Sequence, residues 1–461
     1  MPSKRPPSQE SPASANDATT ASPASDAPSA PSTPAEPSAT SAPSPQPLDH
    51  LRASDLRAVA QLATQATLGV SAIVEGVHQA VLQTMGASGT TKGKTRGITG
   101  LVYRAVQGMT EVVGQGLGVA FEQLEPLLES LVDAPPETPE REAVLAALNG
   151  VMGDRLAATD NPLATAMTLR HQGQALNLQA PLPLAKASGK VLLLIPGLCM
   201  NDLQWIPSGP RPEPGQDAAS APSDHGAVLA AELGTTPIYL RYNTGLHTSQ
   251  NGHQLASQLE QLLDQWPVPV EELSVVVHSM GGLVIRSAVY YARLGALRWP
   301  DRLKNIVFLG TPHHGAPLER AGNWVDIILD STPYSRPFAK LGQLRSAGIT
   351  DLRWGNVLDA DWQKKDRFAR SPDLRQPLHL PHGIACCTVA ATAVAQRSPL
   401  ADRLIGDGLV PLASALGQHE DPQRYLMFAS TAQTIVYNTH HMELLHSPEV
   451  TRQLLAWLAP H

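Results

Sequence analysis

From about Gly173 onwards, short runs rich in Val, Ile and Leu alternate with amphipathic stretches of helical period. The apolar runs are Val191–Ile195, Pro237–Tyr242, Leu273–Val277, Ile306–Leu309, Ile384–Ala390 and Tyr425–Ala429. The helical stretches are His225–Leu233, Gly252–Trp266, Gly281–Leu294 and Pro448–Leu458. Continuous apolar runs are typical of strands buried on both faces, and their alternation with helices favours parallel pairing. The chain is therefore predicted to form an α/β fold, in which a mostly parallel sheet has helices on both faces.

The first 172 of the 461 residues differ from the rest in composition and in the spacing of their apolar residues. Residues 1–47 are almost entirely Pro, Ala, Ser and Thr, with 12 prolines, so they have too little apolar surface to offset the entropy of ordering. Residues 48–172 carry apolar side chains at helical spacing, which predicts helices over Asp55–Met85, Ile98–Leu131 and Pro139–Leu156. We therefore expect a disordered tail over 1–47, a helical region over 48–172 and an α/β domain over 173–461.

Composition and charge exclude several classes of protein. Lys and Arg number 34 and Asp and Glu 41, and the net charge of −7 disfavours binding to a phosphate backbone. The sequence has no apolar run of membrane-spanning length, and the N-terminus has no apolar run of signal-peptide length. The three cysteines, Cys199, Cys386 and Cys387, suit buried free thiols rather than a disulfide or zinc scaffold. These features predict a cytoplasmic protein without a nucleic-acid partner.

The strongest chemical signal is the segment Leu273 to Gly282. A mostly apolar strand runs into Ser279, two glycines follow, and then a helical pattern begins. This order of strand, tight turn and helix is that of a nucleophile elbow, in which the turn exposes the serine hydroxyl. The first free N–H groups of the helix favour negative charge that develops beside the serine. Val277 stands where the usual Gly-x-Ser-x-Gly pattern has its first glycine.

A second strand end supplies the expected hydrogen-bond donors. The run Val191–Ile195 leads into Pro196-Gly197 and then a more polar loop. The backbone N–H groups of Leu198 and Met280 are predicted to form an oxyanion hole beside Ser279. The alternative is a plain Pro-Gly turn after a buried strand.

The C-terminal quarter supplies an acid and a base. Asp407, between two glycines, follows the run Ile384–Ala390, and His441 follows the run Tyr425–Ala429. The order Ser, Asp, His is the one this kind of sheet uses for a catalytic triad. Asp402 and Asp330 are alternative acids, and His440 is the alternative base, since either histidine could reach the serine.

Five segments together resemble the α/β-hydrolase lipases and esterases, and most of all the group similar to GPI inositol-deacylases and bacterial lipases. They are Pro196-Gly197-Leu198, His278 to Gly282, Leu309 to Gly315, Gly406 to Pro411, and His441 to Leu445. The resemblance covers about residues 173–461. It implies a serine carboxylic-ester hydrolase without a metal or organic cofactor. Pro196 departs from the family, in which a histidine before the glycine is common.

The remaining histidines have less specific interpretations. His313 and His314 follow the run Ile306–Leu309 and are expected to line the pocket, with a metal-binding pair as the alternative. His278 is expected to pack beside the elbow. The insert from Ser208 to Asp224, rich in Pro, Ala and Ser, is expected to be a solvated loop, with a part in the entrance as the alternative.

The sequence therefore predicts a serine esterase or lipase that acts on acyl or polyester substrates. An acyltransferase or thioesterase with the same triad is one alternative. A protein that binds a lipid or granule surface, with a vestigial site, is another. For residues 48–172, a packed helical bundle is the simpler interpretation. The more specific alternative is a peripheral contact with a membrane or granule surface.

Overall fold

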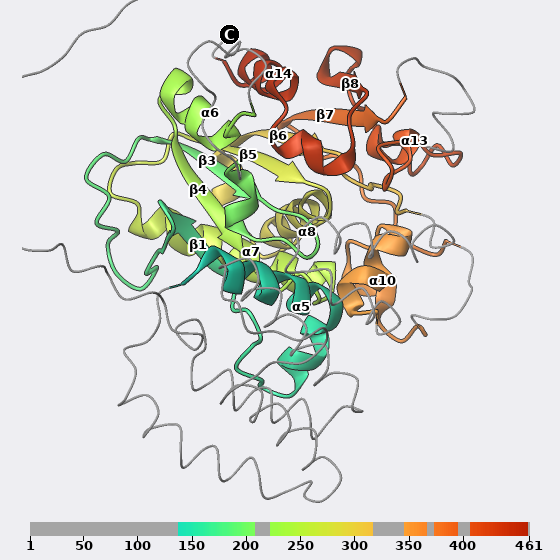
Figure 1. Cartoon of the computed structure of the whole chain (residues 1–461), viewed down its shortest axis with the longest axis horizontal. Helices are drawn as coiled ribbons and strands as arrows, with labels where there is room; N and C mark the ends of the chain where they lie inside the picture. Colours follow the sequence, from blue (N-terminus) through green and yellow to red (C-terminus); the bar gives the residue numbers. More distant parts are fainter. Residues whose placement is uncertain (1–136, 208–221, 317–344, 367–372, 395–405, 460–461) are drawn as a thin grey trace, which may run out of the picture. The chain divides into compact units, whose positions relative to one another are not determined.

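A computed structural model describes residues 137–207, 222–316, 345–366, 373–394 and 406–459 (Figure 1). The expected tail and the two helices expected before residue 136 lie outside these ranges. Asp330, Asp402 and residues 208–221 of the insert also lie outside them. Helices and strands carry the labels of Figure 1.

The described residues contain an eight-stranded sheet with the order β2-β1-β4-β3-β5-β6-β7-β8. The pairs from β4 through β3, β5, β6 and β7 to β8 are all parallel. At one edge, β1 pairs antiparallel with both β2 and β4. The strands are β1 (Thr168–His171), β2 (Gln174–Ala175), β3 (Lys190–Ile195), β4 (Thr236–Arg241), β5 (Glu272–His278), β6 (Leu303–Leu309), β7 (Ala385–Thr392) and β8 (Gln433–Tyr437).

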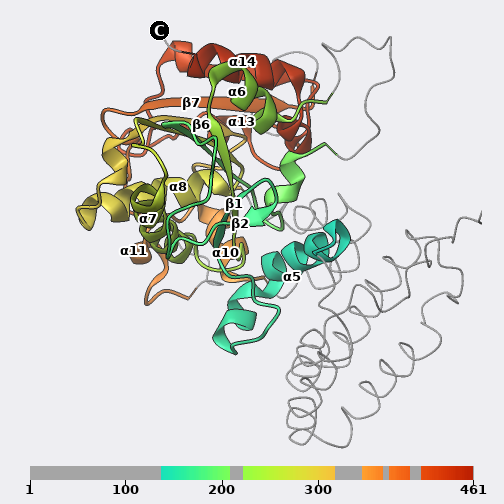
Figure 2. The ribbon, with the colours of Figure 1, turned by 90° about the vertical axis from the view of Figure 1, so that its left-hand side faces the viewer.

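Helices cover both faces of this sheet (Figures 1 and 2). The longer ones are α5 (Pro139–Ala158), α6 (His225–Leu233), α7 (Thr248–Gln265), α8 (Gly281–Leu294), α10 (Ala347–Trp354) and α14 (Pro448–Leu458). Short turns of helix are η1 (Asp202–Trp205), η2 (Trp299–Asp301), α11 (Asp359–Trp362), α13 (Leu412–Ala415), η4 (Ser430–Ala432) and η5 (His441–Leu445).

Successive strand residues point to opposite faces, and each face has its own apolar layer. Leu193 and Val275 pack with α7 and α8 on one face. Leu194 and Val276, the next residues along, pack with α6 and α14 on the other. Burial on both sides explains why the strands are continuously apolar. The expected mostly parallel sheet with helices on both faces is confirmed, and it is the architecture of an α/β-hydrolase.

The α/β unit begins earlier than residue 173. β1 lies before that boundary and pairs with β4, and α5 also lies before it. Apolar side chains of α5, including Leu148, Val151 and Leu156, are buried in the same cluster as Leu198 and Met280. The helix expected over Pro139–Leu156 is therefore present, but it packs on the α/β unit rather than only within a separate helical region.

The sequence predicts the last strand over Tyr425–Ala429. That prediction is wrong, because this run forms no strand. That run has alternating burial, with Leu426 and Phe428 buried and Met427 85% exposed, but it has no strand ladder. The Leu426 N–H donates to the carbonyl of Gly417 instead. The pairing strand is β8, which lies parallel to β7 a few residues later. Alternating burial here reflects packing of an irregular segment on the core.

The described residues also bear on two features that composition addressed, the absence of membrane-spanning segments and the state of the cysteines. None of the helices in the described ranges combines the length and the apolar character of a membrane-spanning segment. The three cysteines are free thiols: Cys199 and Cys387 are buried and Cys386 is half-buried. Burial raises the pKa of the Cys199 thiol to about 12, which keeps it protonated.

Candidate active site

Ser279 lies on a strained turn between β5 and α8. Its φ is +53°, a left-handed value that costs free energy in a residue other than glycine. The turn is anchored because the Ser279 N–H donates to the carbonyl of Leu309 at the end of β6, over 2.9 Å. The helix follows at once, since the Gly282 N–H donates back to the carbonyl of Ser279. This is the geometry expected of a nucleophile elbow.

The sequence departs from the usual elbow pattern at Val277, and the structure accommodates the change. Val277 is fully buried in the apolar layer between the sheet and α7 and α8. The crowded position is Gly281, where an added Cβ would lie 2.7 Å from the carbonyl oxygen of Ile195. A glycine is therefore needed after the serine, but the valine before it has room in the core.

His441 and Asp407 form a buried pair across two neighbouring strand ends. The Nδ1 of His441 lies 2.6 Å from Oδ2 of Asp407, and both side chains are at most 2% exposed. The other carboxylate oxygen accepts from the backbone N–H groups of Leu409 and Val410, at 2.9 and 2.7 Å. A fourth bond joins the His441 N–H to the carbonyl of Asp407. Since a carboxylate only accepts, the proton on the His441 ring is at Nδ1.

The pair and Ser279 meet at the same edge of the sheet. Gly310 follows the residue that anchors Ser279, and a Cβ on it would lie 3.2 Å from both His441 Cε1 and Asp407 Oδ2. Among the described residues, Ser279 Oγ and His441 Nε2 are buried and have no hydrogen-bond partner. A buried hydroxyl donor and a buried nitrogen acceptor are thus both left unpaired, and such groups call for an explanation such as a catalytic role.

His278, directly before Ser279, also contacts His441. Its Nε2 lies 3.0 Å from the His441 carbonyl oxygen, and the two rings are 4.6 Å apart. Burial, together with the neighbouring His441, lowers the pKa of His278 well below its usual value. His278 is therefore a neutral donor that holds the backbone of His441. The sequence suggested only packing here, because a contact over 163 positions leaves no local signal.

The loop after β3 approaches the serine from the other side. A Cβ on Gly197 would lie 2.9 Å from Cβ of Ser279. Leu198 and Met280 are buried in one apolar cluster. Within the described ranges, their N–H groups donate to no backbone carbonyl. The next residue, Cys199, has a φ of +59° and donates its N–H to Thr244 Oγ1, which fixes the loop.

α5 supports this loop directly. The Asn201 side chain donates to the carbonyl of Glu142 over 3.0 Å. Gly150 faces Cys199 so closely that a side chain there would collide with the Cys199 sulfur. Below the loop, Arg241 pairs with both Asp202 and Glu142, at 2.5 and 2.6 Å. A helix that precedes the sheet in the chain thus sets the position of the expected oxyanion loop.

The alternatives left open by the sequence have different outcomes. His440 is exposed at the start of η5, whereas His441 is buried against Asp407. The alternative acids Asp330 and Asp402 lie outside the described residues. His313 and His314 are expected from the sequence to line the pocket of the serine site, but the pocket that they line does not include Ser279, Asp407 or His441.

The metal-binding alternative for His313 and His314 has no support in their contacts. His313 Nδ1 lies 3.4 Å from the Arg286 guanidinium, and His314 Nε2 lies 3.1 Å from the Gly417 carbonyl oxygen. Over the described ranges, no three His, Cys, Asp or Glu side chains are grouped as metal ligands.

The chain was compared with known protein families, sequences and structures. A family model for a domain of unknown function, DUF7379, matches residues 243–351. No curated protein sequence matches the chain. Among solved structures, the chain is similar to Bacillus licheniformis lipase BlEst2 in its mature form, with a TM-score of 0.38 at 16% identity over 63% of this chain and 97% of that one. It is also similar to Aspergillus fumigatus lipase B, with a TM-score of 0.33 at 10% identity over 86% of this chain and 83% of that one. A third similar structure is Staphylococcus hyicus lipase, with a TM-score of 0.35 at 12% identity over 59% of this chain and 95% of that one.

Proposed function

We propose that this protein is a serine carboxylic-ester hydrolase that acts on acyl or polyester substrates through an acyl-enzyme. The observation that carries the proposal is the pair of unpartnered buried atoms, Ser279 Oγ and His441 Nε2, at one edge of the sheet. Asp407 holds the opposite ring nitrogen of that histidine. The resemblance to GPI inositol-deacylases and bacterial lipases supports an acyl ester as the substrate.

In the proposed reaction, Ser279 Oγ attacks the ester carbonyl carbon while His441 Nε2 takes the hydroxyl proton. The histidine returns that proton to the departing alcohol, which leaves an acyl group on Ser279. A water molecule then attacks the acyl carbon, again with His441 as base, and the acid is released. Asp407 keeps the histidine proton at Nδ1 and stabilises the charged ring that forms in each step.

The negative charge that develops on the substrate oxygen would be stabilised by the N–H groups of Leu198 and Met280. Loss of one such donor typically costs about 10²–10³ in rate. The N-terminus of α8, which starts two residues after Ser279, adds a favourable dipole. No metal or organic cofactor takes part in this mechanism.

The experiment is turnover of nitrophenyl esters of increasing chain length, compared with acyl-CoA thioesters and with transfer to an added alcohol. The proposal expects hydrolysis of the esters, and a fall of about 10⁴–10⁶ in kcat for Ser279→Ala. Ser287→Ala is the matched control, since Ser287 is a buried serine on α8 whose hydroxyl also has no partner among the described residues. Turnover only of thioesters, or only by transfer, would favour the acyltransferase or thioesterase alternative.

We also propose, from composition, a cytoplasmic location and a peripheral contact with a lipid or granule surface through residues 48–172. If every ester and thioester is left intact by the folded protein, the alternative of a surface-binding protein with a vestigial site is the better one.

A further inference from the structure

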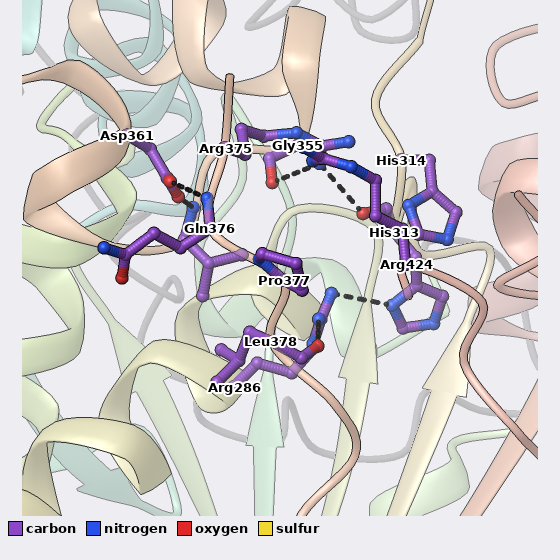
Figure 3. Close-up of a pocket in the computed structure, with 11 residues that line it drawn as sticks. Arg286, His313, His314, Gly355, Asp361, Arg375, Gln376, Pro377, Leu378 and Arg424 are labelled. Carbon is purple, nitrogen blue, oxygen red and sulfur yellow. Dashed lines mark hydrogen bonds between the residues drawn. The ribbon is translucent and has the colours of Figure 1, made fainter. Parts of the chain in front are cut away.

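A pocket lies beside α8 and the turn after β6 (Figure 3). Its space measures about 300 Å³, part of which is open to solvent. It is lined by α8, the turn after β6, the stretch from the end of α10 to α11, residues 375–378 and the loop that carries Arg424. Its distinguishing side chains are Arg286, His313, Asp361, Arg375 and Arg424. Ser279, Asp407 and His441 do not line it, so it is a site of its own.

Arg286 is the buried cation of this pocket, only 5% exposed. Its Nη2 donates to the carbonyl of Leu378 over 2.6 Å, and its Nη1 lies 3.4 Å from His313 Nδ1 (Figure 3). Its Nε is buried and has no partner in the described part of the chain, where no carboxylate forms an ion pair with Arg286. Burial, and then the charge of Arg375, lowers the pKa of Arg286 to about 10. The charge of Asp361 opposes this shift, but no carboxylate of the described residues forms a direct ion pair with Arg286.

His313 presents a second unpaired donor. A guanidinium can only donate, so the Nδ1 that faces Arg286 is an acceptor and the ring proton is at Nε2. That Nε2 is buried and without a partner among the described residues. Burial lowers the pKa of His313 well below its usual value, which keeps the ring neutral. Packing against Phe308 and Phe428 fixes the ring in place. The two unpaired groups of the pocket are therefore both donors, and their complement is an acceptor.

The charges around the pocket define the acceptor further. Arg375 and Arg424 both pair with Asp373, at 2.6 and 3.1 Å. Asp361 accepts from three backbone N–H groups, those of Val357, Leu358 and Gln376. Arg424 also pairs with Asp421, at 3.3 Å, so the two arginines are matched by two carboxylates, whereas Arg286 forms no ion pair within the described ranges. A ligand with a single negative charge would supply the ion-pair partner that Arg286 lacks.

We propose that the pocket binds the carboxylate group of a small molecule, with Arg286 as its main ligand. A carboxylate is planar, carries one negative charge and has two acceptor oxygens, which matches the planar fork and the single charge of the Arg286 guanidinium. The ligand fills the site without contact to Ser279.

The test is a titration of the full-length protein with sodium acetate and sodium butyrate, with ionic strength held constant by sodium chloride. Calorimetry measures binding, and thermal unfolding measures stabilisation. At about 100-fold above its Kd, a bound carboxylate raises the unfolding midpoint by about 5 °C. Inorganic phosphate and sulfate are titrated in parallel, because they share the oxyanion chemistry but carry more charge.

Two substitutions locate the site. Arg286→Met removes the guanidinium and abolishes the stabilisation, whereas Arg293→Met, an exposed arginine later on α8, leaves it unchanged. If Arg286→Met does not fold, Arg286→Lys is used instead. Lysine keeps the positive charge but lacks the paired N–H donors of the guanidinium, so the carboxylate affinity of this variant should fall at least about tenfold. The proposal is overturned if neither carboxylate binds, if only phosphate or sulfate binds, or if folded Arg286 variants bind carboxylate as the wild type does.

Discussion

The Nε2–H of His278 donates to the backbone carbonyl oxygen of His441 across 3.0 Å, so the residue before the proposed nucleophile holds the residue proposed as its base. Both side chains are buried, and their rings lie 4.6 Å apart. This bond joins the end of β5 to the loop after β8, two points that the chain order separates widely. It makes His278 a positioning residue rather than a packing residue alone.

His278→Phe is expected to lower kcat about tenfold while KM stays close to that of the wild type. The substitution leaves the His441 carbonyl buried and unpaired, at a cost of about 1–3 kcal/mol, and loosens the base. His278→Gln keeps an N–H donor and should recover part of the loss. Ester kinetics and urea unfolding of the two variants check this. Wild-type kcat in a folded His278→Phe variant would mean that the bond has no role in positioning.

Asp407→Asn is expected to lower kcat by about 10⁴ without unfolding the protein. The asparagine oxygen would still accept from Leu409 and Val410, which turns its amide N–H₂ towards His441 Nδ1. The ring proton then moves to Nε2, where the nitrogen no longer accepts the serine proton. Steady-state ester hydrolysis measures the effect.

The alternative acids provide the controls for that prediction. Asp330→Asn and Asp402→Asn should leave kcat within about twofold of the wild type. A large loss in either, with little loss in Asp407→Asn, would assign the acid elsewhere.

Much of this fold could be predicted from the sequence because the central strands are buried on both faces. Leu192, Leu193 and Leu194 are all apolar for that reason, and β3 falls where the sequence predicts it. The last strand could not be predicted, since Leu426 and Phe428 pack on the core with a strand-like pattern but form no ladder.

The site could be predicted only where function leaves a local pattern. Asp407 lies between two glycines and Ser279 lies two residues before Gly281, and the geometry brings His441 to Asp407 as the sequence suggested. The roles of α5 and His278 depend on contacts between distant segments. Local periodicity does not report such contacts.

Removal of residues 1–136 is expected to leave hydrolysis of soluble esters intact, whereas removal of residues 1–172 should abolish folding. The shorter deletion keeps α5, β1 and Glu142, which pairs with Arg241 under the oxyanion loop. The longer one strips an apolar helix from the core and leaves Arg241 with fewer partners. Circular dichroism and turnover of a short nitrophenyl ester compare the two.

The same shorter deletion tests the proposed surface contact. Loss of activity on insoluble ester, with soluble-ester activity kept, would support a docking role for residues 48–136. Equal activity on both substrates would contradict it.

Stability is expected to fall as the pH drops below about 6.5, in part through His225. This side chain is buried between Thr451 Oγ1 and the Leu444 carbonyl, and burial lowers its pKa to about 4. Between those two pH values the unfolded chain takes up a proton that the folded chain does not, so unfolding becomes easier. The loss is about 3 kcal/mol by pH 4.

The pH effect is measured as the free energy of unfolding in urea from pH 7.5 to 4. His225→Gln should remove about one proton from the slope of that curve, whereas His382→Gln, at an exposed site, should not. An unchanged slope in His225→Gln would show that His225 takes up protons equally in the folded and unfolded states, so its pKa is not lowered by folding.

The central claim is that His441 makes the hydroxyl of Ser279 reactive, and the most direct measurement is labelling by a fluorophosphonate followed by peptide mass spectrometry. The account predicts one adduct per chain, on Ser279, that is absent in Ser279→Ala and forms far more slowly in His441→Ala. A folded wild-type protein that takes up no label, or takes it up on another serine, would contradict it.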